Sequence, residues 1–411
     1  MKNSRKVTNK LEAGSLRTQD SGTGSQWLLV IGIICVAAAL RAPFTSVGPL
    51  LEMIRDDLGL SNTLAGAITT LPLLAFALLS PFAPQLARKL GLANILMLSM
   101  LGLSMGILIR SASGTVAFFL GTAMVGLSIA LCNVLLPGLI KGKFPQRIGL
   151  MTGIYTVSMN MCAAAASGIS VPLAEQAGLG WRGTLALWFI IAALATLFWI
   201  PQMKKLSQGS TGAVQSSAVR VWRSPLAWQV TLFMGLQSLL YYVLISWFSV
   251  ILGERGMSPG HAGWILSLMQ LAQLPFTFFV PLWAGRMKNQ RMLVAITAVL
   301  FMAGILGVWL GSTELMAVWA VCIGTGGGFA FGLAMMFFSL RTRTTQEASE
   351  LSGMAQSAGY LLAAMGPALF GLLHDRTDSW NVPLAVLAAA SVLLFAAGMG
   401  AGSNRYVGDK K

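Results

Sequence analysis

The stretch PQLARK at residues 84–89 returns 197 residues later as PLWAGR at residues 281–286. Both copies begin with proline, carry alanine three positions on, and end with a basic residue, Lys89 or Arg286. Each copy follows one long apolar run and precedes another. A loop motif repeated at this distance predicts that the chain consists of two related halves.

A second set of matches supports the same division. The triplet KGK at 141–143 has a counterpart 200 residues later in RTR at 341–343. The pair TG at 152–153 likewise has a counterpart in SG at 352–353. Because these matches fall at corresponding points of the two halves, chance similarity between apolar runs explains them poorly.

The runs between these loops are long enough to cross a membrane. The chain of 411 residues is 55% hydrophobic and 10% charged, whereas soluble domains carry about 25% charged residues. A membrane-spanning helix needs about 20 mostly apolar residues. The sequence therefore predicts an all-α membrane protein with twelve transmembrane helices in two six-helix pseudo-repeats. The expected spans are 27–50, 63–83, 92–109, 115–138, 149–172, 182–201, 226–252, 261–284, 292–311, 315–338, 350–373 and 382–402.

The basic residues set the orientation. The formal net charge is +15, but Lys and Arg lie between the apolar runs and not along one solvated face, so we expect no nucleic-acid binding. With the N-terminus inside the cell, 22 of the 28 Lys and Arg residues are cytoplasmic and five are external. Cytoplasmic loops carry the excess of Lys and Arg. This pattern predicts a multi-pass protein of the bacterial inner membrane with both termini in the cytoplasm.

The same pattern predicts the organisation of the chain. Residues 1–26 are polar and basic and lack an early apolar segment, so we expect no cleaved signal peptide. The expected parts are a disordered cytoplasmic tail (1–26), an N-terminal six-helix half (27–201), a cytoplasmic linker (202–224), a C-terminal six-helix half (225–403) and a cytoplasmic tail (404–411).

Several stretches carry a family resemblance. PQLARKLG at 84–91 resembles the loop motif G-x-L-a-D-R-x-G of the major facilitator superfamily, with Pro84 in place of the first Gly and Arg88 in place of the Asp. We expect Arg88, Lys89 and Arg286 to act in this gating loop motif, although the change to Arg88 puts the usual role of the acid in doubt. The other matching stretches are LRAPFTSVGPLL (40–51), TTLPLLAFALLSP (69–81), NVLLPGLIKGKFP (133–145), RSPLAWQVTLF (223–233) and LSGMAQSAGYLLAAMGP (351–367).

Together these stretches are similar to the cyanate-transporter-like branch of that superfamily, and most closely to its 2-nitroimidazole transporter type. The resemblance runs from about Leu40 to Pro383. It implies a secondary active transporter that exports 2-nitroimidazole-type heteroaromatic compounds by alternating access, or one that carries cyanate or a related small anion. It also implies a substrate site near the membrane midplane between the halves.

Arg41 is the one charged residue in the interior of an expected span. A charge there is costly and normally faces a polar cavity. The planar guanidinium suits a carboxylate, a nitro group or a small anion, although it can also bind carbonyl oxygens of neighbouring helices. Thr45 lies one turn further along the same face. We expect Arg41 and Thr45 to contact substrate.

The seventh expected span, the repeat partner of the first, carries Gln237, Tyr241, Tyr242 and Trp247. Aromatic side chains with polar tips can stack on a flat ring and bond its edge, or simply pack between helices. Asn133 in the fourth span is a further candidate, because that helix lines the cavity in this superfamily. Polar residues such as these also serve as bonds between helices.

Other classes of function fit the sequence less well. No HExxH, GxSxG or Walker sequence is present, and the spans hold no cluster of His, Asp or Glu, so we expect no enzyme, no catalytic residue, no metal site, no cofactor and no ATP-driven pump. A sensor would usually bring a soluble output domain, and the polar segments are too short for one.

The sequence allows three kinds of energy coupling. No carboxylate is expected in the interior of a span, and Glu347 and Glu350 are assigned to the cytoplasmic side. Protons could couple through an external acid such as Glu52 or Asp56, travel on the substrate, or play no part. We expect a small-molecule solute and membrane lipid as partners, and a monomer.

Overall fold

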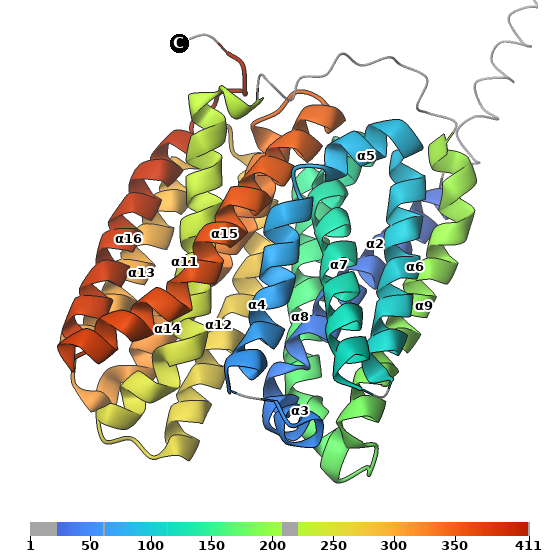
Figure 1. The fold of residues 1–411 in the computed structure, drawn as a ribbon. Helices are drawn as coiled ribbons and strands as arrows, with labels where there is room; N and C mark the ends of the chain where they lie inside the picture. The colour runs from blue at the N-terminus through green and yellow to red at the C-terminus, as the bar shows by residue number, and fades with distance from the viewer. Residues whose placement is uncertain (1–22, 61, 113, 208–220, 410–411) are drawn as a thin grey trace, which may run out of the picture.

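A computed structural model of the chain describes residues 23–60, 62–112, 114–207 and 221–409. Most of the expected N-terminal tail and the middle of the expected linker lie outside these ranges. The described residues form α-helices and two short 3-10 helices, with no strand among them (Figure 1). The predicted all-α class is confirmed.

The first half holds eight of the helices in the described residues. They are α2 (Thr23–Thr45), α3 (Leu51–Leu58), α4 (Asn62–Leu79), α5 (Ala83–Leu90), α6 (Leu92–Ser111), α7 (Thr115–Lys143), α8 (Ile148–Glu175) and α9 (Gly180–Ser207). The second half holds α11 (Pro225–Glu254), α12 (Pro259–Arg286), α13 (Arg291–Leu310), α14 (Met316–Leu340), α15 (Thr345–Thr377) and α16 (Asn381–Ala401).

Eleven helices in the described ranges are long and apolar enough to cross a membrane, and the bent pair α4 and α5 supplies a twelfth span. The prediction of one continuous span over residues 63–83 is therefore wrong, because this segment is a bent pair of helices. The chain turns by 57° between Leu79 and Ala83, because Pro81 lacks the backbone N–H that would continue the helix. The short helix α5 then carries the loop motif across the end of the bundle.

Several spans are longer than predicted. Helix α7 continues to Lys143, and α15 begins at Thr345. Helix α2 begins at Thr23, inside the expected tail, and α9 continues through Ser207, inside the expected linker. Apolar side chains facing outward, such as Leu78 and Leu310 with more than 70% of their surface exposed, fit a lipid environment.

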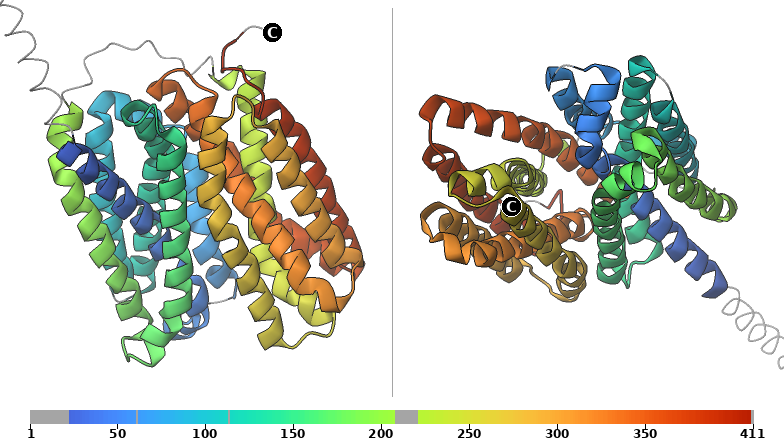
Figure 2. Two further views of the ribbon diagram at one scale, coloured as in Figure 1. Left: turned by 180° about the vertical axis from the view of Figure 1, so that it is seen from behind. Right: turned by 90° about the horizontal axis from the view of Figure 1, so that it is seen from below.

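The two ends of the bundle differ in charge. We call the end with the KGK and RTR loops the basic end, and the opposite end, with α3 and the loop after α11, the far end (Figure 1). Helices of the two halves meet along α8 against α12 and along α4 and α7 against α15. The ribbons of the two halves lie close together at the basic end and diverge toward the far end (Figure 2).

Prolines leave backbone carbonyls free for hydrogen bonds between the halves. Pro137 in α7 cannot donate a backbone hydrogen bond to the carbonyl of Asn133, four residues earlier. Gln356 of α15 fills that place, because its Nε2 donates to this carbonyl at 3.0 Å. A backbone acceptor freed in one half is thus satisfied by a side chain of the other.

The same arrangement occurs twice more between the halves. In each case a proline frees the carbonyl four residues before it, and a hydroxyl from the opposite half donates to that oxygen. The two further sets are Pro81 with Ala77 and Ser357 at 2.6 Å, and Pro281 with Thr277 and Thr156 at 2.6 Å. We call these three bonds the proline latch.

The proline latch gives a testable prediction. Replacing Thr156→Val and Ser357→Ala together should open the basic end, because each lost bond costs about 0.6–1 kcal/mol and together they shift the equilibrium about 5–30-fold. Spin labels at the exposed residues Arg147 and Lys288 would report a longer distance by double electron–electron resonance.

A matched control separates this effect from a general loss of packing. Thr297 and Ser391 are at least as buried as Thr156 and the partly buried Ser357, but their hydroxyls donate to carbonyls of their own helices. The variant with Thr297→Val and Ser391→Ala should keep the short distance. Equal distances in both double variants would show that the proline latch does not hold the halves together.

The C-terminal residues pack against the basic end. The backbone N–H of Val407 donates to the carbonyl of Arg341 at 2.8 Å, and Arg343 forms an ion pair with Asp409 at 2.7 Å. Arg341 is buried and donates to Gln290. Burial lowers the pKa of Arg341 to about 10, so this residue keeps its charge at neutral pH. Part of the expected tail at 404–411 is therefore an ordered strap over the loop before α15.

Candidate functional site

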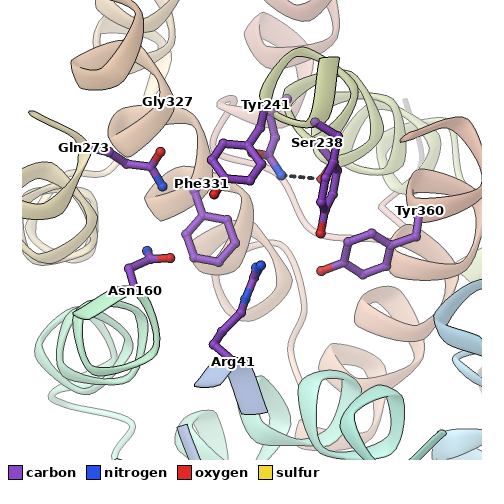
Figure 3. A pocket seen from close by; sticks show the side chains of 10 residues that line it. Arg41, Asn160, Ser238, Tyr241, Gln273, Gly327, Phe331 and Tyr360 are labelled. Carbon is purple, nitrogen blue, oxygen red and sulfur yellow. Dashed lines mark hydrogen bonds between the residues drawn. The ribbon is translucent and has the colours of Figure 1, made fainter. Parts of the chain in front are cut away.

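A cavity lies between the two halves, about midway along the helices (Figure 3). The space between protein atoms there amounts to about 390 Å³, a volume that includes open solvent. Six helices contribute its walls, namely α2, α8, α11, α12, α14 and α15. The lining residues are Arg41, Asn160, Gln237, Ser238, Tyr241, Tyr242, Gln273, Gly327, Phe331 and Tyr360.

Arg41 carries the positive charge of this cavity. Its side chain reaches from the first half toward aromatic rings of the second (Figure 3), and its guanidinium carbon lies 5.8 Å from the centre of the Phe331 ring. Among the described residues, no carboxylate pairs with Arg41, and no acidic side chain lines the cavity. A guanidinium without a counter-ion in such a site favours a ligand that brings negative charge or strong acceptors.

Three tyrosines surround the charge. Tyr241 and Tyr242 pack edge to face with ring centres 5.4 Å apart, and Tyr360 packs against Phe76 of the opposite half at 5.2 Å. These rings and Phe331 offer flat apolar surfaces with hydroxyls at their edges. Such walls accept a planar ring.

Amide side chains complete the lining. Asn160 of α8 has a buried Nδ2 group with no hydrogen-bond partner among the described residues. Gln273 of α12 lines the same wall (Figure 3). Gln237 is committed within its own helix, because its Nε2 donates to Ser238 at 2.7 Å. Arg41 and Asn160, which approach the cavity from the same half, are two donors for which the described residues show no acceptor.

The structure brings four of the seven predicted substrate residues together and leaves three aside. Arg41, Gln237, Tyr241 and Tyr242 line the cavity. The remaining three do not line it, and each makes another bond. Thr45 donates to Arg41 O and to Ala163 O of α8, Asn133 accepts from Tyr155 at 3.1 Å, and Trp247 donates to Pro367 O at 2.9 Å.

Other lining residues were not among the predicted substrate contacts. Asn160 and Tyr360 are polar residues in the middle of spans, and that property was their only signal in the sequence. Gln273 and Phe331 had no signal, since Gln273 resembles Gln270 one turn earlier in the same helix. Choosing between such neighbours requires the rotation of each helix about its axis.

The glycines of α14 show why that helix sits close to the cavity. A side chain at Gly324 would overlap the carbonyl of Met269, and one at Gly328 would approach the carbonyl of Gln273 to 2.5 Å. Helices α12 and α14 thus pack backbone to backbone, as small residues allow in membranes. This contact brings Gln273, Gly327 and Phe331 to one wall.

The cavity is sealed toward the basic end. Lys141 at the end of α7 donates through Nζ to Ser339 O at 2.6 Å and also binds the carbonyl and hydroxyl of Thr342. Arg88 of the loop motif lies 4.0 Å from the Glu350 carboxylate of the opposite half. The hydrogen bonds that Lys141, Thr156, Ser339, Gln356 and Ser357 make to the opposite half lie between mid-depth and the basic end.

Two carboxylates correct an expectation from the sequence. Glu347 and Glu350 lie within α15 in its first two turns, and both are buried, with 7% and 6% of their surface exposed. Glu347 closes a capping box with Thr344, a pairing that fixes the start of the helix. The spans therefore do hold buried acids near the basic end. Lys89 and Arg286, also named from the loop motif, are exposed there.

A helical bundle of two six-span halves that enclose a polar cavity, closed at one end, defines a membrane transporter for small solutes. The profile described as Major Facilitator Superfamily matches residues 29–367 and, in a second match, 231–406. The chain belongs to the Major Facilitator Superfamily. It is a transporter and not an enzyme.

Similar proteins agree with this assignment. The chain is 48% identical over 385 residues to the uncharacterized transporter YycB of Bacillus subtilis (strain 168), covering 93% of this chain and 95% of that one. It is 41% identical over 381 residues to the 2-nitroimidazole transporter of Escherichia coli (strain K12), covering 92% and 96%. The crystal structure of the transporter FucP in the outward conformation superposes with a TM-score of 0.72 at 12% identity, covering 90% and 97%.

Proposed function

We propose that this transporter exports 2-nitroimidazole-type heteroaromatic solutes by alternating access, with the solute held in the Arg41 cavity. The observation that carries the proposal is the cavity itself, in which one unpaired guanidinium faces tyrosine rings and the free amide of Asn160. A nitro group offers two acceptor oxygens to these donors, while the flat ring suits the aromatic walls. The 41% identity to a 2-nitroimidazole transporter supports the same solute.

A second candidate is cyanate or a related small anion. The absence of acidic side chains from the described lining favours it, since nothing there opposes a negative charge. The cyanate transport protein CynX of Escherichia coli (strain K12) is 28% identical over 354 residues. Cyanate leaves the tyrosine walls without a stacking partner, so we place it second.

The orientation and the division of the chain are parts of the same proposal. The basic end would face the cytoplasm of a bacterial cell, with both termini there and the protein in the inner membrane. Residues 27–201 and 225–403 would then be the two rocking halves. Protons are a candidate coupling ion, and the proton:xylose symporter XylE has the same fold, with a TM-score of 0.72 at 11% identity.

The proposal is tested by solute accumulation in cells. A strain that lacks related transporters would express the wild type, and labelled 2-nitroimidazole and cyanate would be followed with and without a protonophore. Lower accumulation of 2-nitroimidazole, reversed by the protonophore, supports driven export. A change in cyanate alone moves the assignment to the anion, and no change in either solute refutes both.

Asn160 provides a specific prediction for the solute. Asn160→Leu should raise the KM for 2-nitroimidazole about 10-fold with little change in the maximal rate, because one neutral hydrogen bond worth about 1 kcal/mol is lost and a buried acceptor of the solute is left unpaired. Met159→Leu, one residue earlier on a buried face that does not line the cavity, is the control. Unchanged KM in Asn160→Leu would remove this residue from the site.

A further inference from the structure

The halves meet along two seams that differ in charge at the basic end. At the α5–α15 seam, Arg88 lies 4.0 Å from the buried carboxylate of Glu350. At the α8–α12 seam, the two helices lie side by side (Figure 2). The sequence repeat relates the seams, because the offset of 197 residues maps Lys89 onto Arg286 and the offset of 200 residues maps Glu350 onto Leu150. The α8–α12 seam therefore keeps a basic loop but lacks the corresponding acid.

Exposed cations of both halves flank the α8–α12 seam. Gly149 of α8 touches Gly285 of α12, since a side chain at Gly149 would lie 3.3 Å from the Cα atom of Gly285. The segments that precede Gly149 and follow Gly285 therefore meet at the basic end. Each segment carries two exposed basic residues. They are Lys143 and Arg147 from the first half and Arg286 and Lys288 from the second.

These four cations have no counter-ion within the described part of the chain. The described acids of the basic end already have partners elsewhere. Glu347 accepts a hydrogen bond from the backbone of Arg343, and Asp409 forms an ion pair with the side chain of that arginine. Glu350 faces Arg88 at the α5–α15 seam. Because like charges repel one another, an anion from outside the chain would stabilise the α8–α12 seam.

The neighbouring surface indicates that this anion is a lipid headgroup. About one turn before Arg286, Trp283 stacks on Phe279 with ring centres 5.9 Å apart, and the two residues are 39% and 43% exposed. Tryptophan is enriched where acyl chains meet headgroups, and basic pockets between transmembrane helices bind anionic headgroups. A phospholipid can cover the rings with its acyl chain while its headgroup reaches the cations. A free phosphate would leave the rings uncovered.

We propose that an anionic phospholipid binds at the basic end of the α8–α12 seam and bridges the two halves. Its headgroup takes the place of the missing acid and contacts Arg147 from the first half and Arg286 from the second. Bound lipid therefore holds the basic end closed, as the contact between Arg88 and Glu350 does at the other seam. This proposal does not depend on the identity of the transported solute.

The test measures lipid preference beside Trp283 in the full-length protein. The protein is placed in nanodiscs that contain brominated phosphatidylglycerol or brominated phosphatidylcholine, and the quenching that Trp283→Phe removes is assigned to this residue. Phosphatidylglycerol should quench Trp283 at a lower mole fraction than phosphatidylcholine does. The double variant with Arg147→Gln and Arg286→Gln should lower this preference by about 5–30-fold, because two of the four cations are lost.

A matched control separates a site from general attraction to a charged membrane. The double variant with Arg223→Gln and Arg405→Gln removes the same charge from exposed positions of the basic end outside the seam. It should keep the preference of the wild type for phosphatidylglycerol. Equal loss of preference in the two double variants would overturn the proposal, and so would equal quenching of the wild type by the two lipids.

A further variant supplies the missing acid. Ser349 is buried where α15 meets Gly138 of α7, so Ser349→Cys, in a background without the native cysteines, reports opening of the basic end. This cysteine should react more slowly with a thiol reagent in phosphatidylglycerol than in phosphatidylcholine. With Arg147→Glu added, it should react slowly in both lipids. A rate that does not depend on lipid before this substitution would overturn the proposed bridge.

Inorganic phosphate distinguishes a lipid from a soluble anion. Added to nanodiscs of phosphatidylcholine, it should leave the reaction of Ser349→Cys unchanged. If phosphate slows this reaction as much as phosphatidylglycerol does, a soluble anion occupies the seam and the lipid proposal is overturned.

Discussion

Arg41→Gln is expected to lower transport at low solute concentration by about 100-fold or more while leaving the protein folded in the membrane. A hydrogen bond to a charged group is worth about 1.5–3 kcal/mol, and the guanidinium can offer two to a nitro group or an anion. No other cationic side chain lines the cavity among the described residues. The measurement is the initial rate in proteoliposomes that contain equal amounts of each variant.

Two companions show which property of Arg41 matters. Arg41→Lys keeps the charge but loses the planar pair of donors, so it should recover only part of the rate. Arg376→Gln removes an exposed arginine at the far end and should transport normally. If Arg41→Gln transports as well as Arg376→Gln does, the cavity does not hold the solute through this residue.

The second large effect is expected at the seal. Lys141→Met removes the ammonium group that binds Ser339 and Thr342 of the other half. Losing these charge-assisted bonds should favour the state open at the basic end by about 10–100-fold. A cysteine at Ser349, which is buried where α15 meets Gly138 of α7, would then react faster with a thiol reagent applied from that end.

Lys143 provides the matched control for this experiment. It lies two residues further along the same helix, is exposed, and makes no hydrogen bond to the opposite half within the described part of the chain. Lys143→Met should leave the reactivity of the Ser349→Cys reporter unchanged. Equal reactivity in both lysine variants would mean that Lys141 does not hold the closed state.

Much of the fold could be predicted because its signals are local and repeated. Apolar runs of about 20 residues define spanning helices in any arrangement of those helices. The repeated loop motifs then relate the two halves. The break between α4 and α5 was missed, since the hydropathy of an apolar run is the same whether or not Pro81 bends the helix.

The site was harder to predict because it depends on helix rotation and tilt. The position of Arg41 at the cavity could be predicted, since a single charge in a span normally faces a polar cavity. Thr45 shares its helical face, yet its hydroxyl binds backbone carbonyls and stays off the cavity. The role of Arg88 was also in doubt in the sequence. Its partner, Glu350, lies 262 positions away, and only the packing of α5 against α15 brings the two together.

Solute protection of a cysteine in the cavity tests the central claim most directly. Ser238 lines the cavity and is small enough to replace by cysteine with little disturbance. In membrane vesicles of known orientation, a membrane-impermeant thiol reagent should modify Ser238→Cys from the far end, and 2-nitroimidazole should slow this reaction. The same reagent should reach Ser238→Cys from the basic end once Lys141→Met is added. Modification that solute does not slow, or access from the far end alone in both backgrounds, would contradict a solute site that opens to each side in turn.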